Sequence, residues 1–209
     1  DQVCWINTNF VKNIKNNDIT KFTFRPSGPN GKYDWLSTSD IEQVMKQYEN
    51  KYNDFKFLGA VPYDFEDLSY LDTYKFNVNK YKSRGKYKFG MVVNLDTHDK
   101  SGSHWVGFYS DTNKKKNYFF DSFAKKPGQR IINFSNKVLN QLTGGGDNNN
   151  NNNIIYNKIR HQFSNSECGV YSMNFIIRLL NGESFENITN NITKDTEMNA
   201  CRRKYFRNN

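Results

Sequence analysis

Cysteine and histidine are both scarce in this sequence, which limits the chemistry that the chain can support. Three cysteines, Cys4, Cys168 and Cys201, are scattered over 209 residues without a Cys-x-x-Cys pair. Three thiols are too few for a secreted disulfide framework, so we expect a reducing, intracellular compartment. No zinc-ligand spacing occurs among these cysteines and the three histidines. The sequence therefore predicts neither a metal site nor another cofactor.

Long apolar runs are missing as well. No stretch of eighteen or more apolar residues occurs, so we expect no membrane-spanning helix. The chain starts at Asp1 with neither a methionine nor an apolar leader, which indicates a processed or truncated start rather than a signal peptide. A length of 209 residues suits one compact domain, and we expect a monomer with a single domain over residues 1–209. Within it, residues 1–34 are expected to form an N-terminal extension and the Gly/Asn-rich residues 143–153 a disordered surface loop.

Acidic residues are too few to balance the basic ones. The chain has 21 Asp and Glu against 30 Lys and Arg, which gives a net charge of +9. Such an excess is compatible with weak nucleic-acid binding through a basic surface, or with an acidic protein partner. No recognition-helix or zinc pattern accompanies the charge, and part of it lies in short turns such as residues 114–116. A solvated lysine-rich surface is the favoured interpretation.

Aromatic side chains are abundant, at 16% of the sequence, and they are expected to build the core. Apolar periodicity predicts helices over residues 39–52, 63–71, 131–142 and 168–180, and strands over residues 55–61, 89–95, 104–109, 117–121 and 154–159. Ser39 and Glu42 have capping-box spacing at the first helix. The strands over residues 104–109 and 117–121 flank a polar turn and are expected to pair as a hairpin. Together these elements predict an α+β domain in which helices flank a central, mixed or antiparallel sheet.

Cys168 is the strongest candidate for a nucleophile. It opens a helix that is apolar almost all round, and the N–H groups and dipole of a helix start favour a thiolate. Gly169 follows it and leaves space for a substrate backbone to approach. A lone cysteine on an apolar helix is more often a small buried hydrophobe. The polar run over residues 161–167 argues for chemistry here, because a structural cysteine has no need of it.

A thiol nucleophile needs a base, a group that orients the base, and donors for the oxyanion. His104 begins a strand and is the preferred base; His161 is the runner-up, and His98 is expected to be solvated in a loop. Asp121 ends the partner strand of the hairpin and can orient the imidazole of His104, although taken alone it is better explained as a turn residue before Ser122. Gln162 can supply a side-chain amide to the oxyanion.

The order His104, Asp121, Gln162 and Cys168 along the chain resembles the SUMO- and ubiquitin-like-specific cysteine proteases and their adenovirus-type relatives. The resemblance covers about residues 35–181, and residues 57–65 look most like the maturation proteases of large DNA viruses. It implies a papain-type α+β fold with the cysteine at the start of a buried helix on the sheet. It also implies that the four residues act, in that order, as base, orienting group, oxyanion donor and nucleophile.

Two tryptophans extend the resemblance. Trp105, next to His104, and Trp35, in a Trp-Leu pair, match the tryptophans that line the family's channel for the last glycines of a substrate. Two indole faces that clamp a peptide leave no room for a Cβ, so glycine is selected by exclusion. The alternative is that both are ordinary core aromatics.

The expected function is that of a viral endopeptidase that cuts after Gly-Gly-X or Gly-X-Gly motifs in structural precursors during virion maturation, in the virion and host cytoplasm. Its partners are then protein substrates with such sites. One alternative is a deubiquitinase or deSUMOylase that removes ubiquitin-like modifiers with the same thiol chemistry. A second is a non-enzymatic basic binding module, which requires four polar residues in matching order to be coincidental.

Overall fold

The structure is a computed structural model that describes residues 25–30, 33–143 and 154–207. Cys4, most of the predicted extension and residues 144–153 of the predicted disordered loop therefore lie outside the described residues. Thr143, the first residue assigned to that loop, instead ends a helix.

A five-stranded mixed sheet forms the centre of the molecule. Its strands lie in sequence order and are β1 Phe55–Val61, β2 Lys88–Asn94, β3 Trp105–Asp111, β4 Lys116–Phe120 and β5 Ile154–Tyr156. The outer pairs β1/β2 and β4/β5 are parallel, and the inner pairs β2/β3 and β3/β4 are antiparallel. The predicted hairpin is thus β3–β4, and β5 is shorter than the predicted strand.

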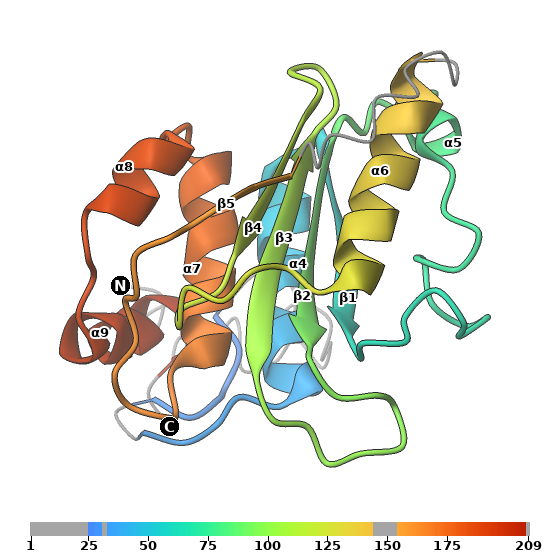
Figure 1. The fold of residues 1–209 in the computed structure, drawn as a ribbon. Coiled ribbons are helices and arrows are strands. Elements are labelled where there is room, and N and C mark those ends of the chain that lie inside the picture. The colour runs from blue at the N-terminus through green and yellow to red at the C-terminus, as the bar shows by residue number, and fades with distance from the viewer. Residues whose placement is uncertain (1–24, 31–32, 144–153, 208–209) are drawn as a thin grey trace, which may run out of the picture.

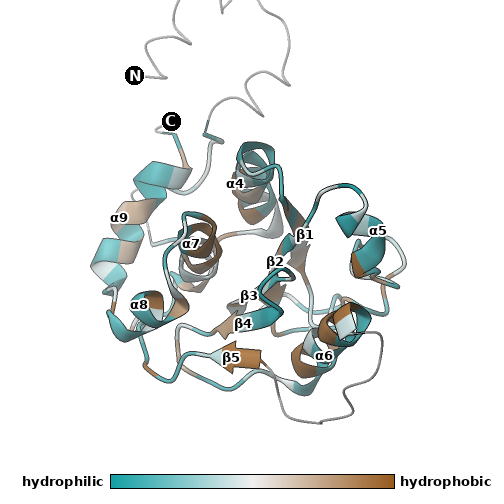
Figure 2. Cartoon of the chain, turned by 90° about the horizontal axis from the view of Figure 1, so that it is seen from above, coloured by the Kyte–Doolittle hydropathy of each residue, from teal (hydrophilic) through white to brown (hydrophobic). Residues whose placement is uncertain are grey.

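Helices cover both faces of the sheet and make three layers (Figure 1). One face carries α4 Thr38–Lys51, α7 Cys168–Leu180, α8 Phe185–Asn190 and α9 Asp195–Tyr205, and the other carries α5 Val78–Lys82 and α6 Gln129–Thr143. Seen from above in Figure 2, the apolar sides of α7 and α6 lie on opposite sides of the sheet. A separate apolar core fills each of the two interfaces. The predicted α+β fold is confirmed.

Helix α7 packs unusually close to the sheet. A Cβ on Gly107 of β3 would lie 2.9 Å from the ring of Phe175 and 3.2 Å from the carbonyl oxygen of Ser172. Glycine therefore permits the approach, and any side chain there would push α7 away from β3. This contact allows α7 to pack closely on β3.

Two local predictions are wrong. The first helix is capped by Ser37, whose side chain accepts from the backbone N–H of Asp40, rather than by Ser39. Glu42, the proposed second half of that box, instead accepts from the backbone N–H of Ala60 on β1 at 2.6 Å. Residues 63–71 form a series of turns rather than a helix. Their backbone hydrogen bonds join residues three positions apart, as from the N–H of Leu71 to the carbonyl of Leu68, and do not continue into a helix.

None of the helices in the described ranges has the length and apolar character needed to cross a membrane. Over the same residues, no group of three or more His, Cys, Asp and Glu side chains is placed to hold a metal ion.

Candidate active site

His104 and Asp121 meet at one end of the β3–β4 hairpin. His104 directly precedes β3 and Asp121 directly follows β4. The antiparallel register therefore brings both to the same end of these two strands. The Nε2 atom of His104 lies 2.7 Å from Oδ1 of Asp121, and both residues are buried. Asp121 is fixed in turn by Asn157, which accepts from its backbone N–H at 2.9 Å and donates to its carbonyl at 2.7 Å.

The surroundings of His104 favour the charged imidazole. Burial opposes the charge, but hydrogen bonds to the side chains of Asp121 and Cys168 outweigh burial and raise the pKa of His104 to about 9. Because Nε2 is engaged by Asp121, Nδ1 is the ring nitrogen left for the thiol. A protonated imidazole between a carboxylate and a cysteine is the arrangement that stabilises a thiolate.

Cys168 is the first residue of α7 and is 3% exposed. The first turn of a helix has free backbone N–H groups, which favour negative charge at the helix start. The Cβ direction of Gly169 is filled, since an added Cβ would lie 3.2 Å from Cβ of Leu36 and 3.4 Å from Cδ1 of Trp105. Gly169 thus brings the helix start against Trp105; that it also leaves room for a substrate backbone stays a prediction.

Gln162 lies in the loop that leads from β5 to α7 and is fully buried. Ser122 holds its amide, because the hydroxyl of Ser122 donates to Oε1 at 2.6 Å. One N–H of Nε2 donates to the carbonyl of Ser164 at 2.7 Å. An amide nitrogen has two N–H groups, and the second is the one that can serve an oxyanion.

The other two histidines have different surroundings. His161 is buried with both ring nitrogens bonded to backbone, Nε2 to the carbonyl of Thr189 at 3.1 Å and Nδ1 to the N–H of Thr193 at 3.3 Å. Burial lowers the pKa of His161, so it is a neutral structural residue and not an alternative base. His98 is exposed in a loop, as expected, and its Nδ1 lies 2.5 Å from Oδ2 of Asp64.

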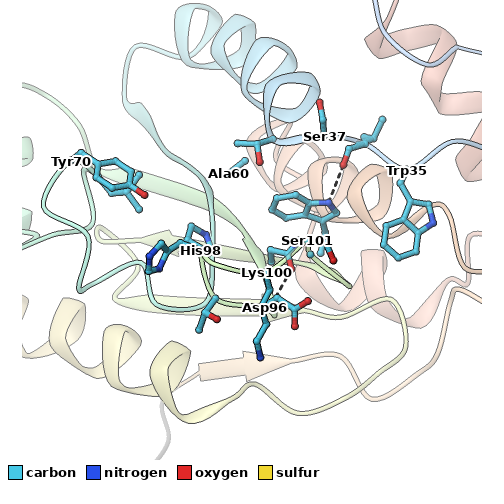
Figure 3. Close-up of a pocket in the computed structure, with 16 residues that line it drawn as sticks. Trp35, Ser37, Ala60, Tyr70, Asp96, His98, Lys100 and Ser101 are labelled. Carbon is cyan, nitrogen blue, oxygen red and sulfur yellow. Dashed lines mark hydrogen bonds between the residues drawn. The ribbon is translucent and has the colours of Figure 1, made fainter.

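A groove of about 600 Å³ opens beside Trp105 (Figure 3). Trp35 and Trp105 both line it, as the tryptophan prediction requires. Trp105 is 7% exposed and donates from Nε1 to the carbonyl of Leu36 at 3.1 Å, whereas Trp35 is 51% exposed. The rest of the lining is mixed in polarity and includes Ala60, Pro62, Tyr70, Asp96, His98 and Lys100.

Helix α9 holds both ends of the loop between Gln162 and Cys168. At its start, Oδ2 of Asp195 accepts from the backbone N–H groups of Phe163 and Ser164, both at 2.9 Å. Further along α9, Arg202 forms a two-bond ion pair with Glu167, the residue before the cysteine, at 2.9 and 2.8 Å. Sequence reasoning assigned no role to Ser122, Asn157, Asp195 or Arg202. Only the glutamate directly before Cys168 offered a signal, as a charge at the start of an apolar helix.

Comparison with known families and proteins also indicates a cysteine protease. Residues 91–209 match the Ulp1 protease family, C-terminal catalytic domain. The chain is 41% identical over 214 residues to the putative thiol protease R355 of Acanthamoeba polyphaga mimivirus, and the match covers all of this chain and 69% of that protein. It is 26% identical over 198 residues to the SUMO-1 cysteine protease S273R of African swine fever virus (isolate Pig/Kenya/KEN-50/1950), covering 88% of this chain and 72% of that one.

Solved structures agree on the fold. The crystal structure of the African swine fever virus pS273R protease matches with a TM-score of 0.74 at 24% identity, over 88% of this chain and 72% of that one. The yeast Ulp1 protease domain, solved in complex with Smt3, matches with a TM-score of 0.59 at 18% identity, over 84% and 76%. With the family match over more than half of its length and a thiol protease as a 41% identical relative, the chain belongs to the Ulp1 protease family and is a cysteine-type peptidase.

Proposed function

We propose that this protein is an endopeptidase that hydrolyses peptide bonds after Gly-Gly-X or Gly-X-Gly motifs in viral structural precursors, during virion maturation in the virion and host cytoplasm. The observation that carries the proposal is the groove that Trp35 and Trp105 both line, since Trp105 directly follows His104 in the chain and contacts the start of α7. The viral origin of the thiol protease relatives supports the setting.

The catalytic roles are supported by the contacts of His104 and Asp121 at the end of the β3–β4 hairpin. The Cys168 thiolate attacks the scissile carbonyl carbon, and the protonated His104 gives its proton to the leaving amine. Water, deprotonated by His104, then hydrolyses the thioester. Asp121 keeps the imidazole oriented and stabilises its charge. The second N–H of Gln162 and the backbone N–H of Cys168 stabilise the oxyanion of each tetrahedral intermediate.

Selection of glycine follows from the two indoles. Trp105 is held rigidly by its bond to the carbonyl of Leu36 and by the start of α7 behind it. Trp35 lines the same groove and is half exposed, so its indole is available to a bound peptide. A chain that passes between two indole faces has room for backbone but not for a Cβ, so larger residues are rejected by overlap.

A second candidate is the removal of a ubiquitin-like modifier. It is favoured by the relatives' names, since African swine fever virus S273R is called a SUMO-1 cysteine protease and Ulp1 was solved with the yeast ortholog of SUMO. Both candidates use the same thiol chemistry and the same glycine channel. They differ in the recognised partner, a short extended peptide in one case and the surface of a folded modifier in the other.

The deciding experiment compares substrates at equal concentration. Peptides with Gly-Gly-X and Gly-X-Gly, their Gly-to-Ala versions, and SUMO and ubiquitin fusions are incubated with the wild type and with Cys168→Ala. We expect cleavage of the glycine peptides, a sharp loss with alanine before the scissile bond, and partial recovery of the alanine peptide relative to the glycine peptide in Trp35→Ala. Efficient cleavage of a fusion together with no cleavage of the peptides would favour the second candidate.

A further inference from the structure

The guanidinium group of Arg160 is held next to residues that contact the catalytic side chains, outside the tryptophan groove. The Arg160 side chain sits between two aromatic rings, 5.0 Å from the centroid of Phe123 and 4.8 Å from that of Phe163. Its Nε donates to the backbone carbonyl of Gln162 at 2.6 Å. Arg160 is nevertheless exposed to solvent, and Phe163 is 69% exposed. Three contacts thus fix the arginine, and its two terminal nitrogens have no partner among the described residues.

This cluster of Phe123, Arg160 and Phe163 adjoins the reacting groups. Phe123 stacks on the imidazole of His104 with ring centroids 4.7 Å apart and planes at 22°. Phe163 directly follows the oxyanion residue Gln162. No member of the cluster lines the Trp35/Trp105 groove. We place the glycines of a bound peptide in that groove and its scissile carbonyl at Cys168. The segment after the scissile bond, which leaves first, is then the part of the peptide that can reach Arg160.

The surroundings of the cluster are basic. Lys125 and Lys126 follow Phe123, Lys158 precedes Arg160, and all three lysines are exposed. In the part of the chain that the structure describes, none of them is paired with a carboxylate. The neighbouring acids are already engaged, since Asp121 binds His104 and Asp195 accepts from the N–H groups of Phe163 and Ser164. The positive charges of these side chains are thus available to a binding partner.

We propose that Arg160 binds the carboxylate of an Asp or Glu within the first few residues after the scissile bond, so that the enzyme selects an acidic leaving segment. The inference rests on the proposed function for the direction of the substrate. Planar guanidinium and planar carboxylate form paired hydrogen bonds. Because stacking and the bond to Gln162 already order the arginine, little side-chain entropy is lost on binding. The exposed ring of Phe163 shields the pair from water.

The first test is a cleavage assay with peptides that share one glycine motif. The three positions after the scissile bond are scanned with Ala, Glu and Lys. We expect Glu at one position to raise kcat/KM about 5- to 10-fold over Ala, the size of one typical hydrogen bond at an exposed site, and Lys to lower it. Arg160→Gln should remove the preference, and Arg160→Glu should reverse it towards Lys. If Arg160 only supported the Gln162 loop, its loss would slow all peptides equally. Lys115→Gln, at the far end of the hairpin, is the charge-matched control and should keep the wild-type preference.

A second measurement does not depend on glycine recognition. Labelled product peptides that carry Glu or Ala at the preferred position, or at each of the three positions, are titrated against Cys168→Ala and Cys168→Ala/Arg160→Gln. We expect the acidic peptide to bind Cys168→Ala about 5- to 10-fold more tightly than the neutral one, and this ratio to fall to about one without Arg160. Equal ratios in the two proteins would overturn the proposal. Cleavage without any glycine requirement would instead contradict the proposed function and leave this binding measurement decisive for Arg160.

Discussion

The ion pair between Glu167 and Arg202 leads to the sharpest stability prediction. Both side chains are 0% exposed, and the guanidinium also donates to the carbonyls of Pro29 at 3.0 Å and Asp34 at 2.5 Å. Arg202→Met keeps much of the apolar stem but leaves the carboxylate of Glu167 buried without a cation. Breaking a buried pair from one side costs about 3–5 kcal/mol, a large part of the roughly 5–15 kcal/mol that stabilises a typical domain.

Urea unfolding followed by tryptophan fluorescence measures this cost. With a denaturant slope of about 2 kcal/mol/M, the midpoint of Arg202→Met should fall by about 1.5–2.5 M. Arg203→Met is the matched control, because Arg203 is the exposed neighbour on α9 and its loss should change stability by no more than about 0.5 kcal/mol. Glu167→Gln combined with Arg202→Met should recover part of the loss, since a neutral amide replaces the stranded charge. Equal midpoints for the two arginine variants would refute the reasoning.

The remaining predictions concern catalysis. Cys168→Ala should abolish hydrolysis, whereas Cys201→Ala should stay within a few-fold of wild type, because burial raises the pKa of the Cys201 thiol; peptide turnover measures both. His104→Ala should cost as much as the loss of Cys168, and Gln162→Ala about 10²–10³ in kcat. Iodoacetamide labelling of Cys168 near neutral pH should fall in the histidine variant only, and an equal fall in both would reverse the assigned roles. The pKa of His104 is raised from 6.5 to about 9, so its contribution to stability is complete below pH 6.5 and is lost as pH rises through about 9. Melting temperatures from pH 6 to 10 should therefore decline less in His104→Ala than in wild type.

Local signals predicted the elements that position the site. The bounds of β1 and of the helix at Cys168 agree with the prediction residue for residue, because apolar runs with clear flanks determine both. The hairpin prediction was enough to place His104 beside Asp121, since an antiparallel pair has only one register that closes a short turn. Gly182 follows α7 with a φ of 89°, as expected of the residue after a helix end.

Contacts between distant segments could not be predicted in this way. Asn157 and Asp121 are 36 positions apart, and their two hydrogen bonds arise only when β5 pairs beside β4. The sequence predicts a helix over residues 63–71, but these residues form turns, because their apolar side chains pack on the sheet without helical backbone bonds. Arg202 looked like surface charge, since nothing in the sequence tells a buried arginine on a basic helix from its exposed neighbours.

The bonds of Arg202 also join three distant parts of the chain. The guanidinium donates to the carbonyls of Pro29 and Asp34 and to the carboxylate of Glu167. The segment that precedes Trp35 is thus tied, through α9, to the residue that precedes Cys168. A change at Arg202 therefore disturbs the groove at Trp35 and the start of α7 together.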